Sequence, residues 1–421
     1  MKGIDFFRRN PVKAFVVGFI VVAIAIVIAL RAPSVMFQRN DWFDGGIRLL
    51  RDDNELAYYF SESYWIDSTV RGDHLPQDYP PLGVLYFSLP RLIGHDPAAF
   101  ALGFVSLNAL MYALLFGIMA SLLEKEGFSA FRLLFFLLPA FLYFSIWRFD
   151  ILPAVLSAGA LLAAKKKSPA PAFLLLFAAV TVKWYAALFF PAFFIYFVLL
   201  GGKEVPIKRL KIALLWTAGA AAALVVVMAA FAGFNALSEP ILFHLSRDFE
   251  NGSVGSALLI GLRTLGIDRP VLHAGMAKLF FFAQFAAGIP VVWKEHPRDF
   301  RSLARSCVFV LIPFIALGLI FSPQWIVWLT PLLLLVADRT ELRLLVALDM
   351  VIFLQFPVLF GINPYGIAYM LCTVIRTGLF GALWLRSYRA LSETGAAALQ
   401  PKNSRQTSAL RKLRAGLPGL Q

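Results

Sequence analysis

The sequence predicts an all-α polytopic membrane protein with about 12 transmembrane helices and a long first extracytoplasmic loop. Three observations support this fold class. Of the 421 residues, 60% are hydrophobic and only 15% are charged. Apolar runs of roughly 20 residues, the length that crosses the hydrocarbon core of a bilayer, recur along the whole chain. Basic segments recur between these runs in a way that fits a single orientation in the membrane.

Basic residues set the expected topology. Lys and Arg within 2–13 precede the first apolar run, so the N-terminus is expected in the cytoplasm. Alternation then places the later basic segments and the C-terminus on the same side of a plasma membrane. Spans are expected near 14–31, 98–122, 131–148, 150–164, 171–183, 184–200, 211–233, 272–293, 305–321, 324–337, 342–360 and 366–386.

These spans form one expected domain, 1–386, with a first outer loop at about 32–97 and a second at about 235–271. Residues 387–421 are expected to be a disordered, basic cytoplasmic tail that rests on the anionic inner leaflet. The formal net charge of +14 therefore indicates a membrane surface and not a nucleic acid. Cys307 and Cys372 lie in apolar stretches and resemble buried hydrophobic residues.

No cofactor is expected. The five histidines are scattered and form no metal-ligand cluster with the cysteines. The sequence also lacks a glycine-rich phosphate loop between a strand and a helix, so a nucleotide site is not predicted.

The first outer loop is unusually acidic. A protein that only carries a substrate across the membrane has little use for such a loop, whereas an enzyme acting on a lipid-borne substrate could draw a general base from it. Asp78-Tyr79-Pro80-Pro81-Leu82 closes the loop before the second apolar run. The acidic residues are Asp41, Asp44, Asp52, Asp53, Glu55, Glu62, Asp67, Asp73 and Asp78.

Charged, amide and aromatic side chains also gather at the outer ends of the expected spans, where charge should be scarce. Basic residues at this depth are costly unless they are paired or face a polar cavity, so a shared outward-facing site is predicted. Its members are Tyr79, Arg148, Asp150, Lys183, Trp184, Tyr185, His244, Arg247, Glu250 and Gln324.

Each signal also has a purely structural interpretation. Arg148 could pair with Asp150, and Lys183 could extend to the outer headgroups. The tryptophans and Tyr185 could form an interfacial aromatic belt. Asp349 and Arg376, which are deeper in their spans, could pair with each other.

Short sequence motifs, taken in their order along the chain, resemble those of the GT-C superfamily of integral membrane glycosyltransferases. Within this superfamily they are most similar to glycosyltransferase family 87, the polyprenyl-phosphomannose-dependent mannosyltransferases. The likeness covers roughly residues 10 to 386. It is carried by Asp52-Asp53-Asn54-Glu55-Leu56-Ala57-Tyr58-Tyr59, Asp78-Tyr79-Pro80-Pro81-Leu82, Arg148-Phe149-Asp150-Ile151-Leu152-Pro153, Val182-Lys183-Trp184-Tyr185, Phe243-His244-Leu245-Ser246-Arg247 and Phe321-Ser322-Pro323-Gln324-Trp325.

The resemblance implies transfer of mannose, or of another hexose or pentose, from a polyprenyl-phosphate donor to a lipid or glycan acceptor outside the cell. It also implies a catalytic aspartate in the first loop. Asp53 ranks first, because it lies about one helical segment before Tyr79-Pro80-Pro81, the spacing that the resemblance leads one to expect. Asp44 ranks close behind, because extra residues after the first span bring Asp44 and Asp41 nearer the membrane, and Asp52 is a further alternative. The donor-binding set is Arg148, Asp150, Lys183, Trp184, Tyr185, His244, Arg247 and Gln324, with Tyr79 and Glu250 elsewhere in the pocket.

Two other functions remain open at this point. A transporter or flippase of a lipid-linked sugar would need a similar cavity, but no internal repeat of the kind such proteins show is evident. An O-antigen-type polymerase or ligase would also use an outer loop and basic residues.

Overall fold

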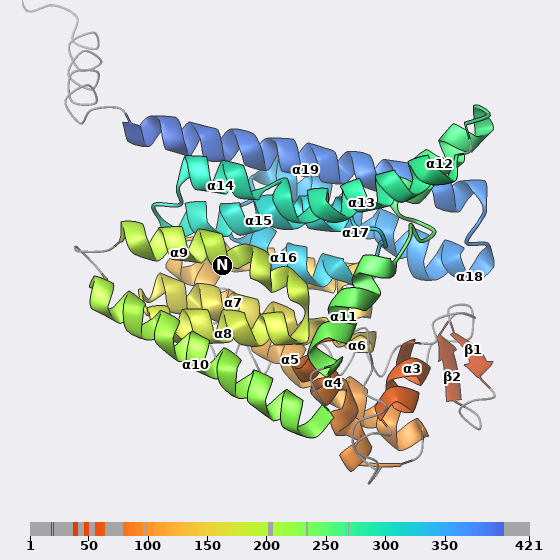
Figure 1. Ribbon diagram of the computed structural model, residues 1–421, viewed down its shortest axis with the longest axis horizontal. Coiled ribbons are helices and arrows are strands. Elements are labelled where there is room, and N and C mark those ends of the chain that lie inside the picture. The colour runs from red at the N-terminus through yellow and green to blue at the C-terminus, as the bar shows by residue number, and fades with distance from the viewer. Residues whose placement is uncertain are drawn as a thin grey trace, which may run out of the picture.

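The computed structural model describes residues 37–40, 46–49, 55–63, 79–95, 97–200, 205–232, 235–267 and 269–399, together with Gly18 and Ile20. This part of the chain is helical apart from one antiparallel hairpin, β1 (Phe37–Asn40) with β2 (Gly46–Leu49). The long helices lie side by side in a bundle, and the hairpin and α3 (Glu55–Glu62) lie near one end of it (Figure 1). The predicted helical class is confirmed, with the hairpin as an addition inside the expected first loop.

Proline sets the start of many helices. It occupies the first helical position of α4, α6, α8 and α13, where its missing N–H costs nothing and its fixed φ favours the helix. After α3 the elements are α4 (Pro81–Ser88), η3 (Leu89–Leu92), α5 (Pro97–Lys125), η4 (Ala130–Leu137), α6 (Pro139–Trp147), α7 (Ile151–Lys165), α8 (Pro169–Val182), η5 (Trp184–Phe189), α9 (Phe190–Leu199), α10 (Ile207–Ala232), α11 (Asn235–Ser246), α12 (Val254–Thr264), α13 (Pro270–Ala286), α14 (Ile289–Glu295), α15 (Phe300–Ala316), η6 (Pro323–Trp325), α16 (Ile326–Leu334), α17 (Arg339–Phe353), η7 (Leu354–Leu359), α18 (Phe360–Ile362) and α19 (Ile367–Leu399).

Several of these helices could cross a membrane. By length and composition, five in the described part of the chain qualify: Ala99–Lys125, Ile207–Ala230, Val271–Glu295, Arg339–Ile362 and Ile367–Glu393. A sixth results if η4 and α6, which meet at a 69° bend, count as one span. Other apolar helices there have only 10–17 residues. The count of about 12 spans stays a prediction, and the span expected at 14–31 lies outside the described residues except for Gly18 and Ile20.

The expected loops and tail contain more structure than predicted. The second outer loop, 235–271, holds α11 and α12, and the first holds the hairpin, α3, α4 and η3. The last span continues past Arg386 as one helix to Leu399. The prediction of disorder is therefore wrong for 387–399, and residues 400–421 lie outside the described part of the chain.

Asp349 connects α17 to the start of α6. Its carboxylate accepts hydrogen bonds from the backbone N–H groups of Ala140 and Phe141, each at 2.9 Å. These N–H groups belong to the first turn of α6 and have no acceptor within their own helix. The suggested pairing of Asp349 with Arg376 is wrong, because Arg376 instead donates to Gln355 and to the carbonyl of Gly252.

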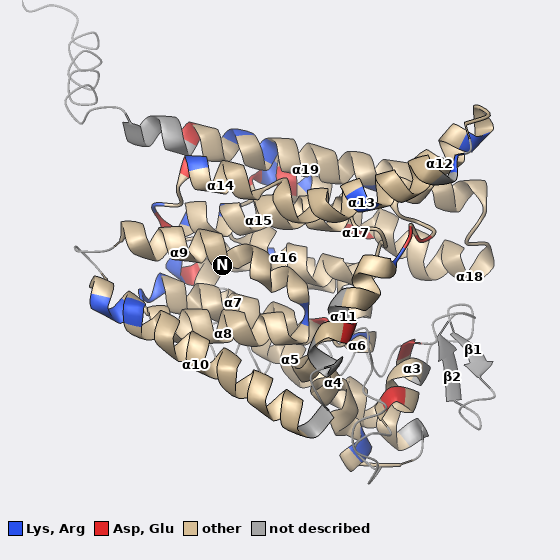
Figure 2. Ribbon diagram, in the orientation of Figure 1, with Lys and Arg blue, Asp and Glu red and all other residues tan. Residues whose placement is uncertain are grey.

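Ion pairs tie helix ends together at one end of the bundle. Glu126 follows α5 and pairs with Lys165 at the end of α7 and, at 2.8 Å, with Arg301 in α15. Asp338 pairs with Arg386 at 2.5 Å. Lys and Arg also mark the start of α10 at this end (Figure 2). The opposite end carries the turns that follow α6, α8, α11 and α15.

Tyr59 anchors α3 to that opposite end of the bundle. Its buried ring stacks on Phe87 of α4 and Phe104 of α5 at centroid distances of 5.0 and 5.4 Å, and meets Phe149 edge-on at 5.4 Å. Aromatic pairs of this geometry stabilise beyond their buried area. Glu55 lies one helical turn before Tyr59, so this packing also fixes the position of the Glu55 carboxylate.

Candidate functional site

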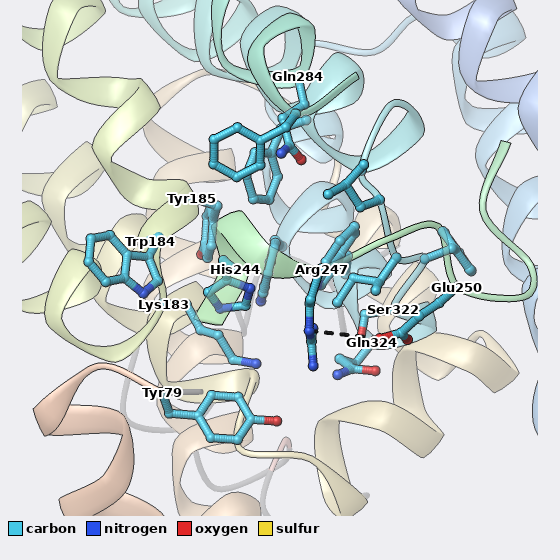
Figure 3. Close-up of a pocket in the computed structure, with 18 of the residues that line it drawn as sticks. Tyr79, Lys183, Trp184, Tyr185, His244, Arg247, Glu250, Gln284, Ser322 and Gln324 are labelled. Carbon is cyan, nitrogen blue, oxygen red and sulfur yellow. Dashed lines mark ion pairs between the residues drawn. The ribbon is translucent and has the colours of Figure 1, made fainter. Parts of the chain in front are cut away.

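A cavity of about 560 Å³ opens where these turns meet, a size typical of small-molecule sites. Elements far apart in the sequence contribute to it, from α3 to α16 (Figure 3). The wall residues are Glu55, Tyr58, Tyr79, Pro80, Lys183, Trp184, Tyr185, His244, Arg247, Glu250, Phe281, Gln284, Phe285, Phe314, Gly318, Leu319, Ile320, Phe321, Ser322, Gln324, Trp325 and Trp328.

Most of the residues predicted from the outer turns lie on this wall. They are Tyr79, Lys183, Trp184, Tyr185, His244, Arg247, Glu250 and Gln324. Arg148 and Asp150 are not on the wall but contact residues that are. The predicted catalytic aspartates, Asp41, Asp44, Asp52 and Asp53, lie outside the described residues. The structure thus brings the predicted donor-binding set together, while their roles stay predictions.

Lys183 is held at the cavity by a buried carboxylate and two rings. It ends α8 in an extended conformation, and its Nζ lies 3.6 Å from the Asp150 carboxylate. The same Nζ lies 4.5 Å from the ring centre of Tyr79 and 4.4 Å from that of Phe149, within cation–π range. Only 9% of Lys183 is exposed, and its side chain lines the cavity.

Arg148 pairs with Glu55. The structural interpretation of the sequence had suggested Asp150 as its partner, which is wrong. Its Nε lies 3.6 Å from the Glu55 carboxylate. The buried Asn108 of α5 fixes the chain there, because its amide donates to the carbonyls of Ile146 and Arg148 at 2.8 and 3.1 Å. Tyr86 donates in turn to Asn108 at 2.8 Å. This network places the Arg148 guanidinium directly behind the cavity wall.

Glu55 is a carboxylate on the wall itself. Burial raises its pKa, but the Arg148 guanidinium and the hydrogen bond donated by Tyr59 lower it, and the net pKa falls below the usual value. Lys183 and Arg247 add to this lowering. Glu55 is therefore ionised at neutral pH and can accept a proton or a hydrogen bond.

Arg247 and Glu250 form the other charged side of the cavity. Arg247 Nε lies 3.8 Å from the Glu250 carboxylate, and the guanidinium lies over the Phe243 ring at 4.4 Å. Glu250 is exposed, so its attraction for Arg247 is weakened by solvent. Figure 3 shows the Lys183 and Arg247 side chains pointing toward the same part of the cavity, with Gln324 beside Arg247. Two cations facing one space favour an anionic ligand.

Aromatic side chains form the rest of the wall. Tyr185 stacks on Trp328 with ring centroids 3.9 Å apart, and Trp328 stacks on Trp325 at 5.5 Å. Phe314 contacts both Trp325 and Phe285. Trp147, Tyr185 and Trp325 are 8%, 1% and 7% exposed, so the aromatic-belt interpretation is wrong for these three. The aromatic wall offers an apolar surface beside the two cations.

Sequence reasoning missed several wall residues. Glu55 stood among many acids of the first loop, and only its spacing of four residues from Tyr59 on one helix face singles it out. Gln284 and Phe281 lie one turn apart in α13, and nothing in the sequence distinguishes that turn from others. Phe314 and Trp328 were hidden in apolar runs.

Among the described residues, no group of three or more histidine, cysteine or acidic side chains could hold a metal ion. The chain matches no protein-family model. It also matches no curated protein sequence. The geometry of the cavity is therefore what carries a functional assignment.

Proposed function

We propose that this protein is a membrane glycosyltransferase that moves a sugar from a polyprenyl-phosphate donor to a lipid or glycan acceptor on the extracytoplasmic face. One observation carries the proposal. A single cavity at the end of an apolar helix bundle combines two cations, Lys183 and Arg247, with two carboxylates, Glu55 and Glu250, and with an aromatic wall that includes the Tyr185–Trp328 stack. For a lipid-linked sugar phosphate, the cations can bind the phosphate, a carboxylate can take the proton of the acceptor, and the aromatic wall can contact the apolar part of the donor. The pattern of motifs that resembles glycosyltransferase family 87 points to the same substrate class.

The orientation follows from charge. Lys and Arg gather at the bundle end opposite the cavity, around Glu126 and the start of α10 (Figure 2). Basic residues favour the cytoplasmic side of a membrane, which supports an extracytoplasmic position for the cavity. Nucleotide sugars are absent there, so a lipid-borne donor suits the location. We assign the protein to the plasma membrane, with both termini cytoplasmic.

The reaction can be described through these residues. The donor phosphate binds Lys183 and Arg247, with Gln324 and His244 close by. The acceptor hydroxyl oxygen attacks the anomeric carbon, the bond from that carbon to the phosphate oxygen breaks, and polyprenyl phosphate leaves with the bonding electrons. The cations stabilise the charge that develops on this leaving group. A carboxylate from the first loop takes the hydroxyl proton.

Two carboxylates are the leading candidates for this base. Glu55 lies on the cavity wall and is ionised. Asp53 remains the aspartate that the sequence ranks first, with Asp44, Asp52 and Asp41 behind it, and all of them lie outside the described residues. The proposed reaction needs only one first-loop carboxylate to act as the general base.

The decisive experiment uses the purified protein in lipid vesicles with radiolabelled polyprenyl-phosphate mannose and a panel of lipid and glycan acceptors. Transfer of label to an acceptor supports the proposal. Movement of the labelled lipid between leaflets without transfer would instead support a flippase. Joining of preformed glycan chains would support a polymerase or ligase.

A further inference from the structure

Arg376 is a buried cation that the proposed reaction does not use. It lies in α19, is 1% exposed and is absent from the cavity wall. Its guanidinium makes contacts in three directions. One nitrogen donates to the side chain of Gln355, another donates to the carbonyl of Gly252 at 2.5 Å, and its plane lies over the Phe321 ring at 3.2 Å.

Two of these contacts lead to the cavity. Phe321 is itself a wall residue, and Gly252 lies in the turn between α11 and α12, two positions after Glu250. Glu250 is the carboxylate that pairs with Arg247. Arg376 therefore connects α19 to both the aromatic wall and the charged side of the cavity.

The 250–253 turn depends on contacts with its surroundings. Asn251 donates its side-chain amide to the carbonyl of Pro364 at 2.5 Å, and the Glu250 N–H donates to the carbonyl of Leu319, a wall residue, at 3.0 Å. Gly252 has a φ of 86°, and a Cβ there would lie 2.6 Å from the Tyr369 hydroxyl. A glycine fits this conformation and this close approach, whereas other residues would be strained.

Arg376 itself is held in one orientation. Gln355 accepts its hydrogen bond, and the amide of Gln355 donates to Thr373 Oγ1 at 2.7 Å, on the α19 turn that precedes Arg376. A planar guanidinium can bind two acceptors and stack on a ring at the same time, which an ammonium cannot do. Gln355 thus fixes the Arg376 guanidinium from the α19 side, and the guanidinium in turn binds the 250–253 turn through the Gly252 carbonyl.

We propose that Arg376 is a positioning residue that holds the 250–253 turn and Phe321 at a set separation, and through Glu250 aims Arg247 at the phosphate of the donor. The part concerning the donor rests on the proposed function; the part concerning the turn does not. Loss of Arg376 then leaves Lys183 and Glu55 in place and changes the Arg247 side of the cavity together with the position of Phe321.

The first test measures the turn directly. Amide hydrogen exchange is followed in the full chain in detergent for wild type, Arg376→Met and Arg376→Lys, with Arg386→Met, ten residues further along α19, as the control. Exchange in peptides covering 249–254 should rise by at least about tenfold in both Arg376 variants and stay unchanged in Arg386→Met. The lysine variant keeps the charge and serves if the methionine variant fails to fold. Unchanged exchange in 249–254 would overturn the proposal.

The second test is a double-mutant cycle on binding of geranylgeranyl phosphate, followed by the fluorescence of the cavity tryptophans. Arg376→Met should weaken binding about tenfold in the wild-type background and have little effect once Arg247→Met is present. An equal loss in both backgrounds would rule out the route through Arg247. If the wild type does not bind the lipid phosphate, the proposed donor fails, while the exchange experiment still decides the positioning role.

Discussion

Lys183 has little freedom to move, because one carboxylate and two rings surround its ammonium group. The carboxylate of Asp150 accepts no hydrogen bond within the described residues, so Lys183 at 3.6 Å is its closest stabilising partner there. A ligand phosphate that reaches Lys183 therefore meets a cation already directed at the cavity. Such preorganisation removes part of the ordering cost of binding.

Replacing Lys183 or Arg247 by methionine should weaken binding of the donor far more than that of the acceptor. A charge-assisted hydrogen bond contributes about 1.5–3 kcal/mol, which corresponds to roughly 10- to 150-fold in affinity. Binding of a polyprenyl phosphate to the purified variants measures this. Lys208→Met, an exposed lysine at the opposite end of the bundle, is the matched control. Unchanged donor affinity in both variants would refute the phosphate assignment.

Glu55→Gln and Asp53→Asn separate the two leading candidates for the base. Each substitution keeps the shape of the side chain and removes its basicity. The variant that lacks the true base should lose roughly 10²–10⁴-fold in transfer rate while its donor affinity changes little. The other variant should stay within about tenfold of wild type. If both retain full activity, neither residue is the base, and Asp44, Asp52 and Asp41 become the next substitutions.

Charged residues of the cavity could be predicted where charge is exceptional. Lys183 and Arg247 stood out because basic residues at the outer ends of apolar runs are costly. Glu55 did not stand out, because the surrounding loop is acidic throughout. Gln284 could not be found at all, since one neutral amide in an apolar helix carries no positional signal. Its place on the wall depends on how α13 packs against α15, which only the folded chain defines.

Among the elements, α6 depends on a residue from a distant helix. The two hydrogen bonds from Ala140 and Phe141 to Asp349 satisfy its first turn. Helix caps of this kind commonly contribute about 1 kcal/mol, and a buried unsatisfied N–H adds to the loss. Because Arg148 directly follows the last residue of α6, the placement of α6 also determines where that guanidinium lies.

Asp349→Asn should destabilise the protein by about 1–3 kcal/mol, because the amide offers one acceptor oxygen and turns an NH₂ group toward a backbone donor. Thermal unfolding in detergent, compared with the exposed control Asp248→Asn, measures the effect. A melting temperature equal to that of the control would show that the two hydrogen bonds contribute nothing.

Element boundaries show where the sequence was insufficient. The apolar run at 131–148 was expected to form one span, yet it bends by 69° between η4 and α6. Pro139 marks the bend, but hydropathy averages across it, and the carboxylate that caps the second part comes from Asp349 in α17. Likewise, the polar 235–271 segment contains α11 and α12, whose packing against the bundle no local pattern indicates.

At the scale of the whole molecule, the two ends of the bundle differ in charge and in content. One end has the salt bridges of Glu126 and Asp338, and the other has the cavity. The helical class and the basic end could both be predicted, because they depend on composition and on the placement of Lys and Arg. The shape of the cavity could not be predicted, since the cavity arises from turns separated by most of the chain.

Cysteine labelling tests the orientation. Cys307 and Cys372 are both buried, so a single cysteine introduced at an exposed position can be labelled selectively. In intact cells a membrane-impermeant maleimide should react with Leu265→Cys, in the turn after α12, and not with Lys208→Cys, at the start of α10. Permeabilised cells should show both reactions. Labelling of Lys208→Cys alone in intact cells would reverse the topology.

Each cation around the cavity already has its own carboxylate: Arg148 with Glu55, Lys183 with Asp150 and Arg247 with Glu250. Matched charges produce only a weak long-range field, so small anions are not drawn in by electrostatic attraction alone. Inorganic phosphate would have to compete with these carboxylates and would gain no contact with the rings. A phosphate on an isoprenoid chain gains that apolar contact as well. For the proposed donor, selectivity over inorganic phosphate would then come from the lipid tail.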